Sequence, residues 1–332
     1  MHEVILSVGI DIGTSTTQLI FSRLTIENRA SSYTVPRIDI VDKEVIYRSK
    51  IYFTPLRSAT EIDAEAVKRI VREEYQAAGM TPEMLRTGAV IITGETARKE
   101  NANEVLEALS DLAGDFVVAT AGPDLESVLS ARGAGTDALS KEKRTAIANV
   151  DIGGGTTDIA VITLGSMACS TSLKLAGDAL TAAVQRFVRE KYQIVVGENM
   201  AERIKIALGS VAPLPVPLSF EVSGKDLATA SPRTIALSDT DTREAFQPIT
   251  EKLVSAVMGI LEVTPPELGA DIMRQGMLLT GGGALLRGFA DRITRARRIP
   301  VYVDSDPLTT VLRGAGITLD DPEKYRDLLI EC

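Results

Sequence analysis

One short pattern occurs twice in the chain and constrains its fold more than any other feature. Its first copy is Asp11-Ile12-Gly13-Thr14-Ser15-Thr16-Thr17, which stands between the strand-like runs 4–10 and 17–24. Its second copy is Asp151-Ile152-Gly153-Gly154-Gly155-Thr156-Thr157-Asp158, between the strand-like runs 146–151 and 158–164. We interpret the two copies as an internal repeat of a hairpin. The repeat predicts two related halves.

Helical and strand-like patterns alternate after each hairpin. In the first half we predict helices over 63–78, ended by Gly79, over 97–109 and from Pro123, with strands over 89–93 and 115–119. In the second half we predict helices over 178–191, 200–208 and 242–263, with a strand pair at 218–223 and 234–237. Such alternation is typical of a parallel α/β sheet, and 332 residues are enough for two domains.

Composition excludes several classes of function. The chain is 45% hydrophobic and 24% charged, without the apolar run of about 18 residues that a membrane span requires. Glu3 stands where a signal peptide would carry positive charge, so we expect a cytoplasmic protein. A net charge of −9 disfavours nucleic acid as a partner, because binding to phosphate backbones normally requires a basic surface.

The scarcity of histidine and cysteine narrows the available chemistry. Cys169 and Cys332 lie far apart and lack metal-ligand spacing, so we expect a reduced chain without a zinc site. The single histidine, His2, leaves no residue for an imidazole-based triad elsewhere. Carboxylates, hydroxyls, backbone amides and a bound metal must therefore supply any chemistry.

Each Asp-Ile-Gly turn has the residues that a phosphate site needs. A tight glycine turn lets backbone N–H groups approach phosphate oxygens, and an aspartate at a strand end can hold hydrated Mg²⁺. One copy alone also describes an ordinary hairpin. Two such turns facing each other across a cleft could clamp a polyphosphate and its metal from both sides, with Asp11 and Asp151 in the metal shell.

A third glycine-rich motif follows the apolar run 276–279. Thr280 is followed by Gly281, Gly282 and Gly283, and a helix is predicted from near Ala284. Without side chains in the way, a purine and its ribose could lie against this backbone near a helix N-terminus. Taken alone, the motif is equally well explained as a structural turn.

In this order and spacing, the three motifs resemble the superfamily of actin, the sugar kinases and the heat-shock chaperones. The resemblance implies a two-lobed α/β fold, a duplicated ribonuclease H-like architecture with a five-stranded sheet in each lobe, that closes on ATP and Mg²⁺ in the cleft between the lobes. It also implies that Asp11 and Asp151 act on the metal and the attacking water. The nucleotide-binding residues it implies are Gly13, Thr14, Ser15, Thr16, Gly153, Gly154, Gly155, Thr156, Gly281, Gly282 and Gly283.

The first half resembles a narrower family, EutA, the reactivating factors of ethanolamine ammonia-lyase. The resemblance covers residues 1–158 and is carried by the stretches 6–14, 17–23, 52–55, 91–97 and 121–127. Proteins of this kind use ATP to release damaged cobalamin from the inactivated lyase. The resemblance therefore implies a chaperone-like function and the lyase as partner.

The second half is similar to another family, MreB, the bacterial actin of rod-shaped cells. The resemblance covers residues 151–320 and is carried by the stretches 201–206, 265–268, 279–287 and 306–309. In that family a Glu and a Lys at the spacing of Glu202 and Lys205 face the nucleotide, whereas without the resemblance this pair would be a solvated salt bridge. From both resemblances we predict a first lobe over 1–148 and a second over 149–332.

The bacterial actin family normally has a glutamate just before a proline at its hydrolytic site, and this chain differs there. Gly122 precedes Pro123, and Glu126 is the nearest acidic substitute, with Asp124 second. We predict that Glu126 orients the attacking water. The alternative is a carboxylate that stabilises the start of a helix.

Two functions remain open. The favoured one is an ATP-hydrolysing reactivase of ethanolamine ammonia-lyase, with weak ATPase activity. The alternative is a cytoskeletal ATPase that self-associates into filaments, although residues 1–10 are predicted to form a core strand and not a basic membrane-binding helix. A small-molecule kinase is least favoured, because no sugar-site motif is recognisable.

Overall fold

The computed structural model describes residues 2–28, 38–58, 61–93, 96, 101–110, 112, 116–120 and 123–319. The chain forms two compact units. The first comprises the chain up to Gly133 together with the part from Val311 onward, and the second is Ala134–Thr310. The lobe limits predicted from the two resemblances, 1–148 and 149–332, stay a prediction.

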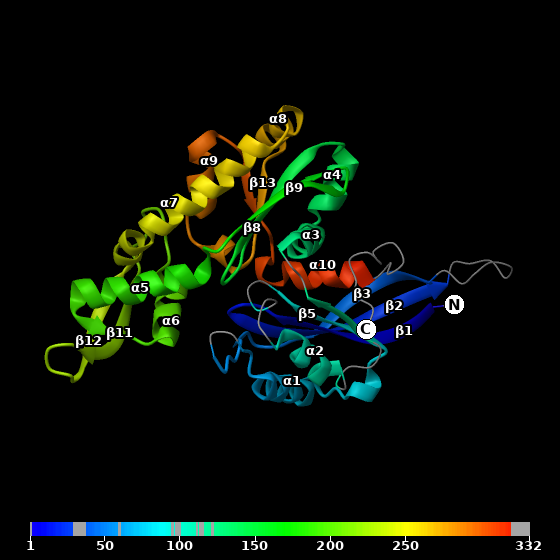
Figure 1. Ribbon diagram of the computed structural model, residues 1–332, viewed down its shortest axis with the longest axis horizontal. Coiled ribbons are helices and arrows are strands. Elements are labelled where there is room, and N and C mark those ends of the chain that lie inside the picture. Colours follow the sequence, from blue (N-terminus) through cyan, green and yellow to red (C-terminus); the bar gives the residue numbers. More distant parts are fainter. Residues whose placement is uncertain are drawn as a thin grey trace. The chain divides into compact units, whose positions relative to one another are not determined.

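The first unit is built on a mixed sheet with the strand order β3-β2-β1-β5-β6 (Figure 1). β1 runs antiparallel to β2 and parallel to β5, and the short β4 pairs with the start of β2. The strands are β1 (His2–Ile12), β2 (Thr16–Asn28), β3 (Ile38–Arg48), β4 (Tyr52–Phe53), β5 (Thr87–Ile92) and β6 (Phe116–Thr120). The helices are α1 (Ala64–Ala78), η1 (Pro82–Met84), α2 (Ala102–Ser110), α3 (Pro123–Gly133) and α10 (Thr310–Leu319).

The second unit has a five-stranded sheet with the order β14-β13-β7-β8-β9, and a small sheet with the order β10-β11-β12. The strands are β7 (Ala146–Ile152), β8 (Thr157–Thr163), β9 (Ser166–Leu173), β10 (Ile194–Val195), β11 (Ser219–Asp226), β12 (Pro232–Ser238), β13 (Met277–Thr280) and β14 (Val301–Val303). The helices are α4 (Thr136–Lys143), α5 (Gly177–Tyr192), α6 (Glu198–Leu208), α7 (Asp239–Val263), α8 (Pro266–Gln275), η3 (Gly282–Leu285), α9 (Phe289–Arg297) and η4 (Pro307–Thr309).

The two large sheets share one topology, which confirms the predicted repeat. β1 and β7 hold the same central place: each forms an antiparallel hairpin with the next strand and pairs in parallel with a later strand on its other side. β3 and β9 each extend the hairpin, and β6 and β14 each close the parallel side. The Asp-Ile-Gly turn of each copy therefore lies at the same end of the same strand.

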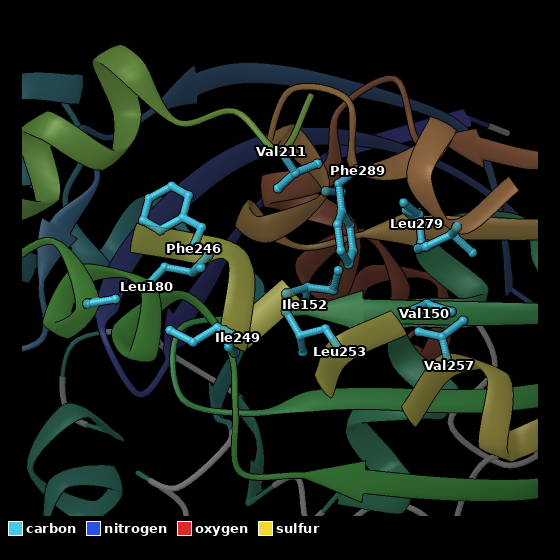
Figure 2. Close-up of a cluster of buried hydrophobic side chains, with 14 of the residues drawn as sticks. Val150, Ile152, Leu180, Val211, Phe246, Ile249, Leu253, Val257, Leu279 and Phe289 are labelled. Atoms are coloured by element: carbon cyan, nitrogen blue, oxygen red, sulfur yellow. The ribbon is translucent and has the colours of Figure 1, made fainter. Parts of the chain in front are cut away.

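The core of the second unit fixes the strand that carries Asp151. All seven residues of β7 are buried, as expected for a central strand covered on both faces. Figure 2 shows Val150 and Ile152 of β7 among side chains of β13, α7 and α9, including Leu279, Leu253 and Phe289. Burying each such side chain stabilises the fold by about 1.5–3 kcal/mol. The backbone around Asp151 is therefore held by packing on several sides.

Local signals placed several helix ends correctly. The Asp63 side chain accepts a hydrogen bond from the Ala66 N–H at the start of α1, and Gly79 ends this helix in the left-handed conformation, with φ of 66°. α7 begins earlier than predicted, because Ser238 and Asp241 form a capping box. Pro266, shortly after the end of α7, is the first residue of α8. The helix predicted over 97–109 is described from Ala102 onward, and residues 97–100 lie outside the described residues.

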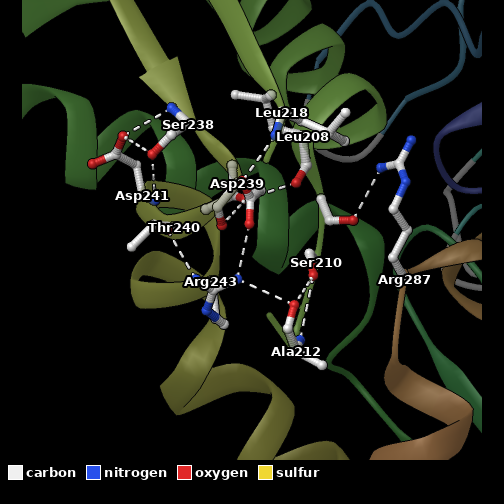
Figure 3. Close-up of polar contacts among 12 residues, drawn as sticks. Leu208, Ser210, Ala212, Leu218, Ser238, Asp239, Thr240, Asp241, Arg243 and Arg287 are labelled. Carbon is white, nitrogen blue, oxygen red and sulfur yellow. Dashed lines mark hydrogen bonds and ion pairs between the residues drawn. The ribbon is translucent and has the colours of Figure 1, made fainter. Parts of the chain in front are cut away.

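A buried aspartate joins the start of α7 to the proline-rich loop before β11 (Figure 3). The Asp239 carboxylate accepts hydrogen bonds from the Leu218 N–H and from Arg243, each at 3.0 Å. Arg243 also donates to the Ala212 carbonyl at 3.1 Å. The Leu218 N–H and the Arg243 guanidinium hold the pKa of Asp239 below its ordinary value, against the opposing effect of burial.

None of the helices among the described residues combines the length and the apolar composition that a membrane span requires.

We predict that Asp239→Asn destabilises the protein at pH 7 by about 1 kcal/mol, because the charged acceptor is replaced by a neutral one. The folded-state pKa lies below the unfolded value of about 3.9, so this stabilisation is present above that value and is lost as pH falls through the folded-state pKa. Urea midpoints measured from pH 7 downward should therefore approach each other for the variant and the wild type as pH falls through the folded-state pKa of Asp239. Asp42→Asn, at an exposed position on β3, is the control. A difference as large at the lowest pH at which both proteins stay folded as at pH 7 would contradict this explanation.

Candidate functional site

The second Asp-Ile-Gly turn joins β7 to β8 and is closed by a backbone hydrogen bond. The Gly153 N–H donates to the Thr156 carbonyl at 3.0 Å. Asp151, 4% exposed, is the second-last residue of β7. It lies in register with Asp158 on β8 and with Thr280 on β13. Polar side chains from three strands therefore meet at this end of the sheet.

The start of α5 contacts this turn and donates hydrogen bonds to two of its carbonyls. The Gly177 N–H donates to the Gly153 carbonyl at 3.1 Å, and the Asp178 N–H donates to the Gly154 carbonyl at 2.8 Å. Within the part of the chain that the structure describes, the N–H groups of Gly154 and Gly155 have no hydrogen-bond acceptor. With its carbonyls satisfied and two N–H groups unused, the turn has the polarity of an anion site.

Lys205 and Glu202 lie beside the same turn. The Lys205 ammonium donates to the Gly177 carbonyl at 3.2 Å and pairs with Glu202 at 2.7 Å. The Glu202 carboxylate accepts a hydrogen bond from Thr181 of α5 at 2.6 Å. Both charged side chains are only 17–20% exposed, so this is not a fully solvated pair. Their contact with a nucleotide stays a prediction.

Sequence reasoning missed Gly177, Asp178 and Thr181. A side chain at Gly177 would place its Cβ 3.2 Å from both the Gly153 carbonyl oxygen and the Lys205 ammonium. The available signal was a glycine immediately before the helix predicted over 178–191. A glycine at the start of a helix is common, so the sequence alone does not indicate that Gly177 contacts the second turn.

The three glycines after β13 have different surroundings. Gly281 has φ of +76°, and a Cβ there would lie 2.3 Å from an Asp151 carboxylate oxygen. A Cβ at Gly283 would lie 2.2 Å from Ile152. Gly282 is exposed, and a Cβ there would meet only Leu308, at 3.4 Å. Close packing on β7 therefore requires glycine at two positions, while the third has room on its outer side.

The first turn repeats the geometry of the second with different supports. The Gly13 N–H donates to the Thr16 carbonyl at 2.8 Å. The Gly13 carbonyl accepts hydrogen bonds from the hydroxyls of Thr54, at 2.7 Å, and Thr96, at 3.1 Å. The Thr54 N–H donates to the Ser15 carbonyl at 3.0 Å. Threonines take the place that α5 holds in the second unit, and sequence reasoning assigned no role to them.

Asp11 is the counterpart of Asp151, at the second-last position of β1. Thr93 directly follows β5, and its hydroxyl donates a hydrogen bond to the Asp11 carboxylate at 3.2 Å. Among the described residues there is no group of three or more acidic, histidine or cysteine side chains placed to hold a metal. A cation here would therefore rely on one or two carboxylates together with oxygens from a ligand and water.

Glu126 lies in the first turn of α3 and is 8% exposed, whereas Asp124 is exposed. Burial distinguishes the two acidic residues, but both the catalytic role and the helix-end role of Glu126 stay predictions. Gly122, the position where the bacterial actins carry their glutamate, lies outside the described residues.

The predicted residues thus form two groups. The first unit gathers Asp11 and the turn Gly13–Thr16 around three threonines, and the second gathers Asp151, its turn, Lys205 and the three glycines. That the two groups face each other across a cleft stays a prediction.

Family models match both parts of the chain. The model described as ethanolamine utilisation protein EutA matches residues 3–208. The model described as cell division protein FtsA matches residues 148–318. The two matches overlap over residues 148–208, which hold most of β7, the second turn, α5 and α6.

Curated relatives divide in the same way. The ethanolamine ammonia-lyase reactivase EutA of Salmonella typhimurium is 41% identical over 197 residues, which cover 58% of this chain and 42% of the relative. The cell shape-determining protein MreB of Escherichia coli is 44% identical over 195 residues, which cover 59% of this chain and 55% of the relative. The chain thus spans about half the length of the curated relatives it matches.

A solved structure matches nearly the whole fold. MreB 5 of Spiroplasma citri, crystallised with AMPPNP, superposes with a TM-score of 0.72 at 25% identity and covers 98% of this chain and 99% of that one. The predicted actin-like fold class is confirmed. The chain therefore belongs to the EutA family through residues 3–208 and to the FtsA family through residues 148–318, and through both to the actin-like ATPases.

Proposed function

We propose that the chain binds ATP and hydrolyses it slowly. The observation that carries this proposal is the second turn, where Gly154 and Gly155 keep two N–H groups unused while α5 satisfies the carbonyls behind them. Backbone N–H groups in such a turn suit phosphate oxygens. The likeness to MreB 5 of Spiroplasma citri, whose structure contains AMPPNP, supports a nucleoside triphosphate as the ligand.

Mg²⁺ fits the residues that are present. It keeps several waters and uses one or two carboxylates together with substrate phosphates, and we propose Asp11 and Asp151 as its protein donors. Bound there, the ion would neutralise charge on the phosphates. The two carboxylates would bind it directly or through water, and Lys205 would place a further positive charge beside the second turn.

We predict that Gly282→Val lowers ATP affinity roughly tenfold, equivalent to about 1.4 kcal/mol, because the branched side chain occupies the space proposed for adenosine. The melting temperature should change little, since Gly282 is exposed and has room for a Cβ. Gly283→Val is the matched comparison, and it should destabilise the fold by displacing Ile152. Calorimetry and thermal melts measure the two effects. Unchanged affinity in Gly282→Val would make the motif a structural turn only.

We predict that Asp151→Asn lowers the ATP hydrolysis rate by at least about 100-fold, because the metal and the attacking water lose a charged partner. Glu126→Gln should also slow hydrolysis if Glu126 orients water, whereas Asp124→Asn on the same helix should not. Phosphate release at saturating ATP and Mg²⁺ distinguishes these variants. A normal rate in Glu126→Gln, combined with loss of activity in Asp151→Asn, would leave Glu126 as a helix-end carboxylate.

We further propose that the protein reactivates ethanolamine ammonia-lyase by releasing inactive cobalamin. The match to the EutA family supports this function, because it covers the whole first sheet and continues through the second turn to residue 208. We place the contact with the lyase on the surface of residues 1–150, which are EutA-like throughout. The cytoplasm, where such an enzyme would be reduced and supplied with ATP, is the proposed location.

Filament formation is the second candidate. It is supported by the 44% identity to MreB over 195 residues and by a structural match that spans nearly the whole chain. A filament needs the front and back surfaces of one molecule to fit each other in a heterologous contact. Here those surfaces would derive from different families, which disfavours the required complementarity.

We predict that the protein with ATP and Mg²⁺ restores activity to cobalamin-inactivated ethanolamine ammonia-lyase, and that Asp151→Asn does not. Recovery of lyase turnover measures this directly. The same protein at micromolar concentration should stay in the supernatant on ultracentrifugation with ATP. ATP-dependent pelleting with filaments visible by electron microscopy, together with no effect on the lyase, would reverse the order of the two candidates.

A further inference from the structure

A buried glutamate in the first unit binds two tyrosine hydroxyls. Glu74 of α1 is 1% exposed, and its carboxyl oxygens accept hydrogen bonds from Tyr47 of β3, at 2.6 Å, and from Tyr52 of β4. The hydrogen bond to Glu74 is the main cause that raises the pKa of Tyr52 to about 12 and also raises the pKa of Tyr47. Both hydroxyls are donors at neutral pH, as any tyrosine is, and the hydrogen bonds to Glu74 join the two residues to α1.

The two tyrosines serve different parts of the unit. Tyr47 lies within the long strand β3, in register with Phe21, and its ring centroid is 5.9 Å from that of Phe21. Tyr52 lies in β4, which contains only two residues and pairs with Thr16 and Thr17 at the very start of β2. One hydroxyl thus joins α1 to the sheet, while the other joins α1 to the edge of the first turn.

Tyr52 is joined to the first Asp-Ile-Gly turn by the short stretch of chain that leads to Thr54. Thr54, two residues later, donates its N–H to the Ser15 carbonyl and its hydroxyl to the Gly13 carbonyl. The Thr54 hydroxyl also lies 3.0 Å from the hydroxyl of Thr17. Residues 52–54 therefore contact both ends of the first turn.

β4 depends on such an anchor. A two-residue strand gains little from its own ladder, and the intervening Phe53 is 50% exposed, so apolar burial does not hold it. The Tyr52 hydrogen bond to Glu74 attaches it on one side and Thr54 on the other. The Lys50 ammonium also lies 5.8 Å from the centroid of the Tyr52 ring, and the Asp63 N–H donates to the Pro55 carbonyl at 2.9 Å. Loss of the Tyr52 hydrogen bond would therefore loosen the short segment that carries Thr54.

Building on the proposed nucleotide binding, we infer that Tyr52, held by Glu74, is a positioning residue for the first phosphate turn. It sets the place of Thr54 and hence the orientation of the backbone at Gly13–Thr16 that would contact the phosphates of a nucleoside triphosphate. Tyr47 shares the same carboxyl group but has no part in this connection.

Tyr47→Phe and Tyr52→Phe are a matched pair, because each removes one hydroxyl from the same carboxyl group. Both should lower the melting temperature to a similar extent. Hydrogen exchange should become at least about fivefold faster at the Gly13 and Thr54 amides in Tyr52→Phe only. This measurement needs no nucleotide, so it tests the connection even if the proposed ATP binding fails. Equal exchange at these amides in both variants would overturn the inference.

The functional arm measures ATP affinity and hydrolysis in the same two variants of the full chain. Tyr52→Phe should weaken ATP binding roughly fivefold, and Tyr47→Phe less than twofold. Faster exchange in Tyr52→Phe without a change in ATP affinity would overturn the part of the inference that concerns phosphate. Absence of ATP binding in the wild type would instead contradict the proposed function and leave the exchange result to decide whether Tyr52 positions the turn.

Discussion

The arrangement around Asp151 depends on how closely the loop after β13 approaches β7. At Gly281 a Cβ would lie 2.3 Å from the Asp151 carboxylate and 2.4 Å from the Ile152 carbonyl, and at Gly283 it would overlap Ile152. Only backbone without side chains can pack at this distance, and Gly281 also has a positive φ that L-residues rarely adopt. This contact seats η3 and, through the hydrogen bond from the Gly281 N–H to Pro307, the segment before α10. The outer two glycines of the third motif are therefore required by packing, whereas the exposed Gly282 between them is not.

The two copies of the Asp-Ile-Gly turn reach one backbone geometry by different means. In both, the first glycine N–H donates to the threonine carbonyl three residues later. In the second unit the start of α5 satisfies the turn's carbonyls, with Lys205 beside it. In the first unit the donors are the hydroxyls of Thr54 and Thr96. The second turn therefore combines a helix start with a nearby cation, while the first depends on short polar side chains and on the anchoring of β4.

The local contacts around the second turn agree with the match of one chain to two families. The overlap at residues 148–208 contains most of β7, the second turn, α5 and α6, which contact one another around Gly153 and Gly177. A junction within this segment keeps each local contact inside a region that both families share. The surfaces outside it resemble different families, which is why a property of the local site transfers more readily than a property of the whole surface, such as partner choice.

The sequence by itself determined the repeat, the alternation of strands and helices, and the three glycine-rich motifs, because these depend on local periodicity and on residues such as Asp63 and Gly79 that act within one helical turn. It also singled out Glu202 and Lys205, through a family resemblance.

Only the tertiary structure decided which glycines are required by packing, because the atoms they would meet belong to β7, far away along the chain. The same holds for Thr54, Thr93, Gly177 and Tyr52, whose hydrogen bonds join segments that no short-range pattern connects. Local patterns fix elements, whereas a site is made by contacts between elements, and those form only when the sheet brings their ends together.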